Sequence, residues 1–335
     1  MICNQDGAVA LYPLFFQPVR VPADWAGSLL PDFRGEPAGD DTAAETWEVI
    51  DAGPLQSVIA NGPLQGRTLG ELTAERPGEL VGSRQRRGEP FPVCLRLLDV
   101  GRHLPLLVHP DENLCAASQG AMQPNVKFWY CLGAKPGAEL MVGIGGRVTG
   151  LQLQQRLNTY ELRELLQVFP ALAGDSYLIP NGRLHSAGAG TLIWELAQRP
   201  APPLEVSAWQ TAVAPPPDEQ ALALRAVHIE DRQVSRICRE TAATTRTRKL
   251  PLVRHCPFFV VDEIRISDHY SDRTDGGSFH LLSVVRGEID LVTDLGVERL
   301  RQGVTCCIPA VFGGYRCAAT GEPASVLRVR QQSLK

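Results

Sequence analysis

The residues whose side chains could do chemistry lie in three segments between positions 104 and 186 of a 335-residue chain. They are two histidines, a lysine, an arginine, an asparagine and a tryptophan: His109, His185, Lys127, Arg183, Asn181 and Trp129. Lys127 could act as a general base or contact a phosphate. Asn181 and Arg183 flank His185, and Arg183 is the cation best suited to a phosphate. Trp129 could stack on a sugar or pack in the core. Two histidines alone bind zinc weakly and leave its geometry undefined, so His109 and His185 could equally be hydrogen-bonded polar residues.

The composition limits the classes of function. Lys and Arg total 33 against 37 Asp and Glu, a net charge of −4, which argues against nucleic-acid binding because that needs a concentrated basic face. We expect no signal peptide and no membrane contact, because no apolar run approaches the roughly 20 residues that cross a bilayer. The nine cysteines are irregularly spaced without a C-x-x-C pair, which favours free thiols in a reducing cytoplasm. Nothing in the sequence specifies an oligomeric state.

Short apolar runs bounded by Gly or Pro predict strands along most of the chain. They lie at residues 93–100, 104–109, 128–132, 139–144, 176–180 and 191–197, and again at 258–267, 278–286, 289–293 and 305–309. Such a succession favours a sandwich or jelly roll over alternating strands and helices. Residues 149–169 carry leucines in a broken 3.6-residue pattern, which predicts two short helices meeting near Asn158. Another short helix is predicted over Thr68–Glu75.

A proline-rich segment separates two similar parts of the sequence. Residues 199–218 contain six prolines, which disfavour helices and central strands, so we predict an extended connector there. Both Ala173–Pro180 and Val285–Ala310 contain a turn glycine and an Ile-Pro corner that look like half of a cupin barrel. The predicted architecture is mainly β, with two cupin-type jelly-roll barrels. The first spans residues 1–198, with a helical insertion at about 149–169, and the second spans residues 219–335.

Five segments, in order, resemble the zinc-dependent type I mannose-6-phosphate isomerases. Ser57–Leu69 reads S-V-I-A-N-G-P-L-Q-G-R-T-L and is similar to the family's S-V-V-x-N-G-P-L-x-G-x-T-L. The other four resemble the family's G-E-S-W-E, F-P-L-L-V-K-F-L-D, L-S-V-Q-V-H-P and I-P-A-G-T-V-H-A-I-G: Glu45–Glu48, Phe91–Asp99, Leu104–Pro110 and Ile179–Gly188. The resemblance covers about residues 35–210. It implies a cupin fold, a bound zinc ion and interconversion of mannose 6-phosphate and fructose 6-phosphate.

In that family, zinc is held by a Gln, two His and a Glu, and only half of this set is retained here. His109 and His185 stand at the histidine positions, but Leu107 replaces the Gln. Aligned from the Trp-Tyr pair, the family's Glu falls on Lys127. An ammonium about 4 Å from Zn²⁺ would repel it by about 8 kcal/mol at an effective dielectric constant of about 20. The family's catalytic Arg falls on Glu205, whose charge would oppose a sugar phosphate.

These replacements imply an isomerase homologue with impaired catalysis and with weak or absent zinc binding. One alternative is an active zinc-dependent aldose–ketose isomerase with rearranged ligands. Another is a non-catalytic protein that binds a sugar phosphate or serves assembly. In a further arrangement, Lys127 fills the vacated metal volume and its ammonium pairs with Glu195 or Glu205. The segments that shape turns and corners still match the family, so we expect the scaffold to persist where the chemistry does not.

Overall fold

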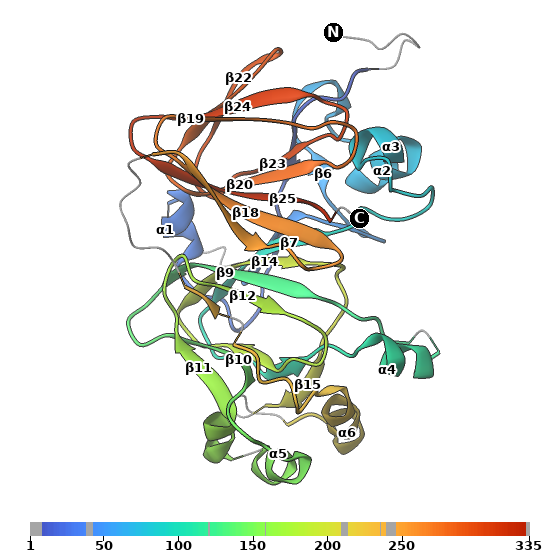
Figure 1. The fold of residues 1–335 in the computed structure, drawn as a ribbon, viewed down its shortest axis with the longest axis vertical. Helices are drawn as coiled ribbons and strands as arrows, with labels where there is room; N and C mark the ends of the chain where they lie inside the picture. The colour runs from blue at the N-terminus through green and yellow to red at the C-terminus, as the bar shows by residue number, and fades with distance from the viewer. Residues whose placement is uncertain are drawn as a thin grey trace. The chain divides into compact units, whose positions relative to one another are not determined.

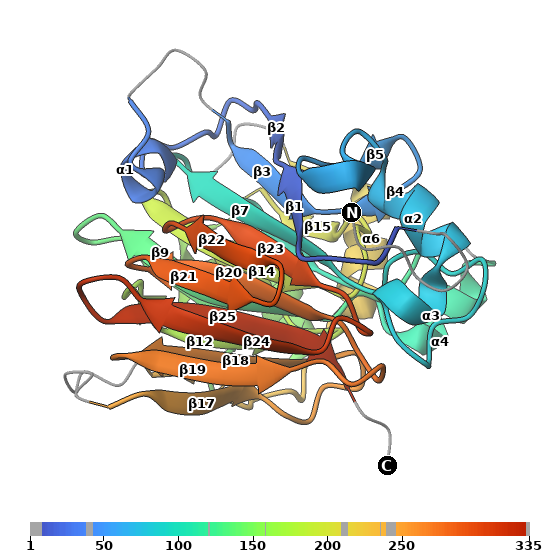
Figure 2. The same cartoon turned by 90° about the horizontal axis from the view of Figure 1, so that it is seen from above.

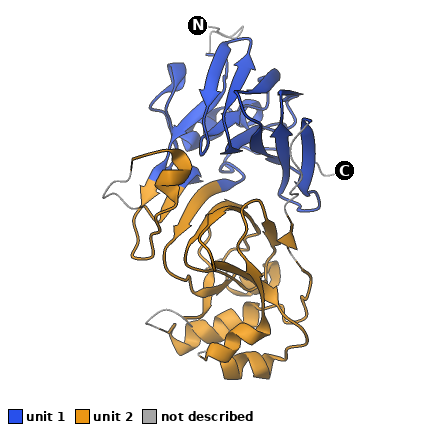
Figure 3. Cartoon of the chain, turned by 90° about the vertical axis from the view of Figure 1, so that its left-hand side faces the viewer, with its two compact units in different colours: residues 1–19, 47–94, 241–335 blue, residues 20–46, 95–240 orange. Residues whose placement is uncertain are grey.

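The computed structural model describes residues 9–37, 43–119, 121–157, 159–208, 214–234, 236–238 and 246–332. The chain divides into two compact units, which Figure 3 colours separately. Unit 1 comprises residues 1–19, 47–94 and 241–335, and unit 2 comprises residues 20–46 and 95–240. Unit 1 is therefore assembled from both ends of the chain, with a third segment from its interior.

Two sheets form the frame of unit 2 (Figure 1). One has the strand order β16-β12-β9-β14-β7-β3-β2. Its strands are β2 (Val19–Val21), β3 (Glu45–Val49), β7 (Cys94–Val100), β9 (Lys127–Ala134), β12 (Ser176–Ile179), β14 (Thr191–Ala197) and β16 (Arg236–Ile237). The other has the order β11-β10-β13-β8-β15. Its strands are β8 (Leu106–Val108), β10 (Glu139–Ile144), β11 (Leu166–Pro170), β13 (His185–Ala187) and β15 (Leu204–Ser207).

The two faces of the five-stranded sheet carry different cores. Leu140 and Val142 pack between the sheets with Trp129 and Tyr177 from the opposite sheet. The intervening Met141 points outward into a second cluster, as the strand alternation requires. That cluster is covered by α5 (Gly150–Arg156), the 3₁₀ helix η2 (Tyr160–Leu165) and α6 (Pro217–Ala226). Unit 2 also contains α1 (Leu30–Arg34) and α4 (Glu112–Ala117).

Unit 1 contains a seven-stranded sheet of order β17-β18-β25-β20-β23-β1-β6, whose strands run side by side in Figure 2. They are β1 (Leu14–Gln17), β6 (Val58–Ile59), β17 (Arg248–Val253), β18 (Phe259–Ile266), β20 (His280–Arg286), β23 (Thr305–Ile308) and β25 (Ala324–Gln331). A four-stranded sheet of order β19-β24-β21-β22 comprises β19 (His269–Arg273), β21 (Ile289–Thr293), β22 (Gly296–Leu300) and β24 (Gly314–Ala319). A small hairpin pairs β4 (Asp51–Ala52) with β5 (Leu55–Gln56).

Buried residues of both larger sheets make one core in unit 1, including Ile264 and Leu282 from one sheet and Leu291 and Cys317 from the other. The unit also contains η1 (Gly62–Leu64), α2 (Leu69–Glu75) and α3 (Pro77–Leu80). Thr68 and Glu71 form a capping box at the start of α2, which fixes where that helix begins. The two sheet pairs confirm the predicted mainly β, jelly-roll fold class.

The predicted helical insertion needs a correction at its end. Residues 150–156 and 160–165 are helical, but Leu166–Pro170 is strand β11. Leu166 and Val168 pair with β10, so sheet pairing outweighs the helical spacing of the leucines there. Asn158, where the two helices were expected to meet, lies outside the described residues.

The units also divide the chain differently from the predicted boundaries. The predicted connector, residues 199–218, belongs to unit 2 and supplies strand β15, which pairs with β8. Residues 209–213 of that segment lie outside the described residues. The N-terminal strand β1 pairs with β23 and β6, and this pairing places it in unit 1 with the C-terminal strands. Within the described residues, no helix has the length and apolar character needed to cross a bilayer.

Candidate functional site

Three side chains from neighbouring strands point to the inner face of the five-stranded sheet of unit 2. Leu107 on β8 lies opposite His185 on β13 and opposite Glu205 on β15. Directly opposed residues share one face of a sheet. His109 follows Leu107 by two positions and so lies on the same side, whereas Leu106 and Val108 pack into the outer core. The sheet therefore presents two imidazoles, a leucine and a carboxylate on its inner side.

The facing sheet contributes Lys127 and Trp129 from β9 and Glu195 from β14. Trp129 is the register partner of Glu195, and Trp129 belongs to the core between the sheets. Lys127 is two residues from Trp129 and therefore faces the same way. Lys127 and Glu195 are 3% and 2% exposed. Such burial of opposite charges requires that they be paired.

Glu195 is the centre of a buried network of charged and polar side chains. Its Oε2 lies 3.2 Å from Lys127 Nζ and accepts a 2.7 Å hydrogen bond from Trp129 Nε1. Its Oε1 accepts a 2.7 Å hydrogen bond from Arg96 Nε. Arg96 Nη1 donates to Glu45 Oε2 at 2.7 Å, so one guanidinium bridges two carboxylates. Two cations and two anions thus balance one another inside the barrel.

The network holds Glu195 and Arg96 in their charged forms. Burial raises the pKa of Glu195, but Arg96, Lys127 and the Trp129 hydrogen bond outweigh it and hold that pKa well below its ordinary value. Burial lowers the pKa of Arg96, and Glu195 and Glu45 more than offset that effect. Lys127 therefore faces a fully ionised carboxylate.

His109 and His185 lie beside this network with unsatisfied nitrogens. They are 1% and 0% exposed, their rings are 5.7 Å apart between centroids, and their planes are within 13° of parallel. Trp129 packs its edge against His185, with ring centroids 5.4 Å apart. Both nitrogens of His109 and Nε2 of His185 have no hydrogen-bond partner among the described residues. Unsatisfied buried polar atoms are uncommon and indicate a ligand, ion or water.

The partner of His185 determines its tautomer. Nδ1 lies 3.1 Å from the Arg183 carbonyl oxygen, which can only accept, so Nδ1 carries the proton and Nε2 presents a lone pair. Burial, and then the charge of Lys127, lower the pKa of His185 to about 4. The same two causes hold the pKa of His109 well below its ordinary value. Both rings are therefore neutral near pH 7.

The donor set does not match a structural or catalytic zinc site. Zinc in proteins takes three or four ligands from Cys, His, Asp and Glu. His109 and His185 have the neutral nitrogens that zinc needs, but Leu107 offers no lone pair and Lys127 offers a positive charge. Across the described residues, no group of three or more His, Cys, Asp or Glu side chains is arranged to hold a metal ion. The residues present do not fit the zinc that the resemblance implies.

Asn181 and Arg183 are engaged by the protein around them. Arg183 makes a two-pronged contact with Asp231, through Nε at 2.8 Å and Nη2 at 2.7 Å. Asn181 Oδ1 accepts a hydrogen bond from the Asn125 backbone N–H at 2.9 Å. These contacts hold the loop between β12 and β13 that carries His185. Glu205 is half-buried, and burial followed by the charge of Glu219 raises its pKa.

The structure thus brings together His109, His185, Lys127 and Trp129, while Asn181 and Arg183 point to other partners. Arg96 and Glu45 belong to the site but were not singled out from the sequence. Arg96 interrupts the apolar run C-L-R-L-L of β7, and Glu45 begins β3. A charge within a buried strand is rarely tolerated without a partner, and this is the signal that could have found Arg96.

Comparison with known proteins places this geometry in context. No family model matches the chain. The chain is 31% identical over 187 residues to probable mannose-6-phosphate isomerase GmuF of Bacillus subtilis, covering 56% of this chain and 58% of that protein. It is 28% identical over 310 residues to mannose-6-phosphate isomerase of Streptococcus mutans, covering 91% of this chain and 94% of that protein. The match therefore spans little more than half the length of GmuF.

A solved structure extends the likeness to the whole fold. The crystal structure of mannose 6-phosphate isomerase from Bacillus subtilis superposes with a TM-score of 0.79 at 25% identity, over 95% of this chain and 99% of that one. The five sequence segments, the paired sheets of each unit and these relatives all agree. This chain is therefore similar to the mannose-6-phosphate isomerases in sequence and in fold.

Proposed function

We propose that this chain has lost the zinc-dependent interconversion of mannose 6-phosphate and fructose 6-phosphate. The observation that carries the proposal is the buried contact between Lys127 and Glu195, 3.2 Å from Nζ to Oε2. An aldose–ketose conversion needs a general base and an electrophile that stabilises charge on the sugar oxygens. In the family zinc supplies the electrophile, and here an ammonium stands where the alignment puts a zinc-binding carboxylate.

An active enzyme with rearranged zinc ligands would need a third donor beside the two imidazoles. Glu195 is the carboxylate in contact with Lys127, but it already receives Arg96, Lys127 and Trp129. Turning it toward a metal would leave buried cations without their counter-charge, at a cost of several kcal/mol. The network therefore supports loss of the metal over its relocation.

We further propose that the barrel interior still binds a sugar phosphate, through direct contacts to hydroxyl groups. His185 Nε2 presents an acceptor, and the neutral ring of His109 presents one donor and one acceptor, all without partners among the described residues. A sugar hydroxyl both donates and accepts, so neighbouring hydroxyls complement this set. Among the described residues, Cys115 and Cys256 form no disulfide, which is consistent with the cytoplasmic location that we propose.

The first test is conversion of mannose 6-phosphate to fructose 6-phosphate by the purified protein with zinc in excess. We expect no turnover, because the donor set lacks the ligands that would hold the metal. Measurable turnover that depends on zinc would overturn the proposal.

The second test rebuilds the missing ligands with Leu107→Gln and Lys127→Glu together, followed by calorimetric zinc titration. We expect zinc affinity to rise by about 100-fold or more, since two donors are added and a repelling charge is removed. Lys127→Met is the matched control, because it removes the charge without adding a donor and should gain much less. Circular dichroism checks that each variant folds. A folded double variant with no gain would show that the site is aligned incorrectly.

The third test is calorimetric titration of mannose 6-phosphate into the natural protein and His109→Phe. Phenylalanine keeps the ring and removes both nitrogens, so we expect affinity to fall about 10-fold. Equal affinity in the two proteins would rule out a hydroxyl contact at His109.

A further inference from the structure

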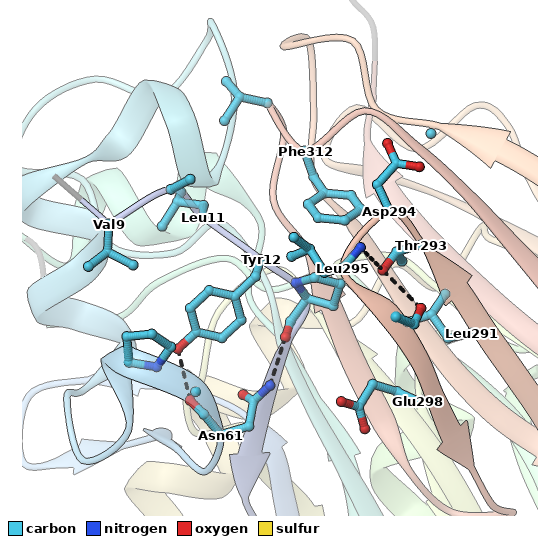
Figure 4. A pocket seen from close by; sticks show the side chains of 17 residues that line it. Val9, Leu11, Tyr12, Asn61, Leu291, Thr293, Asp294, Leu295, Glu298 and Phe312 are labelled. Atoms are coloured by element: carbon cyan, nitrogen blue, oxygen red, sulfur yellow. Dashed lines mark hydrogen bonds between the residues drawn. The ribbon is translucent and has the colours of Figure 1, made fainter. Parts of the chain in front are cut away.

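Unit 1 contains a cavity of about 570 Å³, and its lining residues belong to a different unit from the site described above. Residues 9–13, residues 61–63, the hairpin of β21 and β22, and residues 311–314 line it. Figure 4 shows Tyr12 and Asn61 on one side, and Asp294 and Glu298 with the hairpin on the other. A cavity of this size suits a small organic molecule.

The walls of the cavity are apolar and partly aromatic. Tyr12 and Phe312 supply rings, and Leu291 supplies a fully buried wall. Leu295 and Val311 are 49% and 48% exposed, so part of the apolar lining is open to solvent. A bound apolar group would cover them.

The neutral polar groups that line the cavity are already used by the protein. The Tyr12 hydroxyl donates to the Asn61 carbonyl oxygen and accepts from the Leu64 backbone N–H, each at 2.8 Å. The Asn61 side chain accepts from Phe15 N–H and donates to the Pro13 carbonyl oxygen, each at 3.0 Å. Thr293 Oγ1 likewise accepts from Leu295 N–H at 3.2 Å.

Two carboxylates are different in this respect. Among the described residues, Asp294 and Glu298 have no ion-pair or hydrogen-bond partner for their side chains, and no basic residue lines the cavity. Glu298 is the register partner of Leu291, so both side chains point to the side of the hairpin that faces the cavity. Among the described residues, the charged side chains left for a ligand are therefore acceptors that carry negative charge.

We propose that this cavity binds a small organic cation, a primary ammonium carried on an aromatic or aliphatic body. An ammonium has only donors, which matches a site that offers only anionic acceptors. The aromatic rings of Tyr12 and Phe312 hold the apolar body, and they also favour a cation near their faces. A phosphate would be repelled by the two carboxylates. A sugar would find few side-chain donors among the described lining residues to match its hydroxyl acceptors. This site is independent of the function proposed for unit 2.

The test uses three probes with the same phenyl group on a short chain: 2-phenylethylamine, 2-phenylethanol and 3-phenylpropanoate. Binding to the full chain is measured by calorimetry or saturation-transfer NMR at low and high salt. We expect the amine to bind about 10-fold more tightly than the alcohol at low salt, with the advantage reduced at high salt. The carboxylate probe should bind most weakly. An alcohol that binds as tightly as the amine would overturn the proposal.

Variants then assign the effect to the cavity. Glu298→Gln should reduce the affinity for the amine about 3-fold and leave the affinity for the alcohol unchanged, since only the charged contact is lost. Glu322→Gln is the matched control, because it removes an equal charge from an exposed turn of the same unit that does not line the cavity. Phe312→Ala should weaken both probes, with thermal unfolding as the check on folding. If Glu298→Gln and Glu322→Gln reduced amine binding equally, the amine would be responding to net charge, and the proposed site would be wrong.

Discussion

Each of the two units contains an arginine that bridges a buried carboxylate and a half-buried one. In unit 2, Arg96 joins Glu45 and Glu195. In unit 1, Arg328 joins Asp272 and Asp262, the latter through Nη2 at 2.5 Å from Oδ2. The repetition shows that a buried ionic bridge is a means of fixing these barrels, and is not by itself a mark of a functional site.

The histidines beside the bridges distinguish the two barrels. In unit 1, His280 Nδ1 lies 2.7 Å from the Tyr315 hydroxyl, so its ring has a partner within the protein. In unit 2, both nitrogens of His109 and Nε2 of His185 lack one among the described residues. The His280 nitrogen of unit 1 is therefore satisfied within the protein, whereas the histidine nitrogens of unit 2 can still form hydrogen bonds with a ligand or water. The two polar clusters therefore differ in whether their histidine nitrogens have protein partners among the described residues.

The largest expected effect tests the arginine bridge that both units contain. Arg96→Met and Arg328→Met should each lower the free energy of unfolding by about 3–5 kcal/mol, because each takes a cation away from a buried carboxylate, Glu195 or Asp262. Urea-induced unfolding measures the change. Arg163→Met is a control, since Arg163 pairs with Glu139 near the surface and should cost about 0.5 kcal/mol or less. An effect of Arg96→Met as small as that control would mean that the unit 2 bridge contributes little to stability.

The next effect is a dependence of stability on pH. Burial, and then the charge of Arg328, lower the pKa of His280 to about 4, against about 6.5 in the unfolded chain. Between pH 6.5 and pH 4, His280 is protonated in the unfolded chain but neutral in the folded chain. His280 therefore contributes stability that is present above pH 6.5 and is lost as the pH falls toward 4. His280→Gln should reduce that acid loss by about 2–3 kcal/mol. Urea unfolding of both proteins at pH 7 and pH 4.5 measures it, and identical acid losses would show that His280 is not the titrating group.

The smallest expected effect tests the difference between the histidines of the two units, since His280 has a protein hydrogen-bond partner and His109 has none among the described residues. His280→Phe should lower the free energy of unfolding by about 1–3 kcal/mol, because the buried Tyr315 hydroxyl loses its 2.7 Å contact with Nδ1 and keeps only a 3.4 Å hydrogen bond to Asp272. His109→Phe should change the free energy of unfolding by about 1 kcal/mol or less, since no described protein group loses a hydrogen bond. Measured at pH 7 in the absence of sugar, the two variants form a matched pair. Equal losses would contradict the distinction between a closed cluster and an open one.

Local sequence patterns predicted most strands but not the assembly. Glu139–Ile144 and Thr191–Ala197 occur as predicted because each is a compact apolar run with clear breaks on both sides. Leu166–Pro170 was predicted as the end of a helix because leucine spacing there does not distinguish a short helix from a strand. The pairing of β1 with β23 was not predicted, since local periodicity carries no information on partners so far apart in the chain.

The candidate site was predicted in part for a similar reason. His109, His185 and Lys127 were found because they fall within recognisable motifs. Arg96 and Glu45 were missed because their role lies in contacts across strands, and those contacts depend on sheet order. The cavity lined by Tyr12 and Glu298 could not be expected from sequence, since the segments that line its two sides are more than 200 residues apart in the chain.

The discontinuous make-up of unit 1 has a consequence for biosynthesis. β1 can pair with β6 soon after both are synthesised. Its other edge pairs with β23, where Leu14 and Phe15 lie opposite Cys307 and Cys306, so that edge stays open until β23 has been synthesised. At a translation rate of about 5–20 residues per second, the nascent chain carries that open strand edge for roughly 15–60 s. An unpaired edge invites association with other chains. Strand β1 is therefore a segment that a ribosome-associated chaperone would have reason to shield.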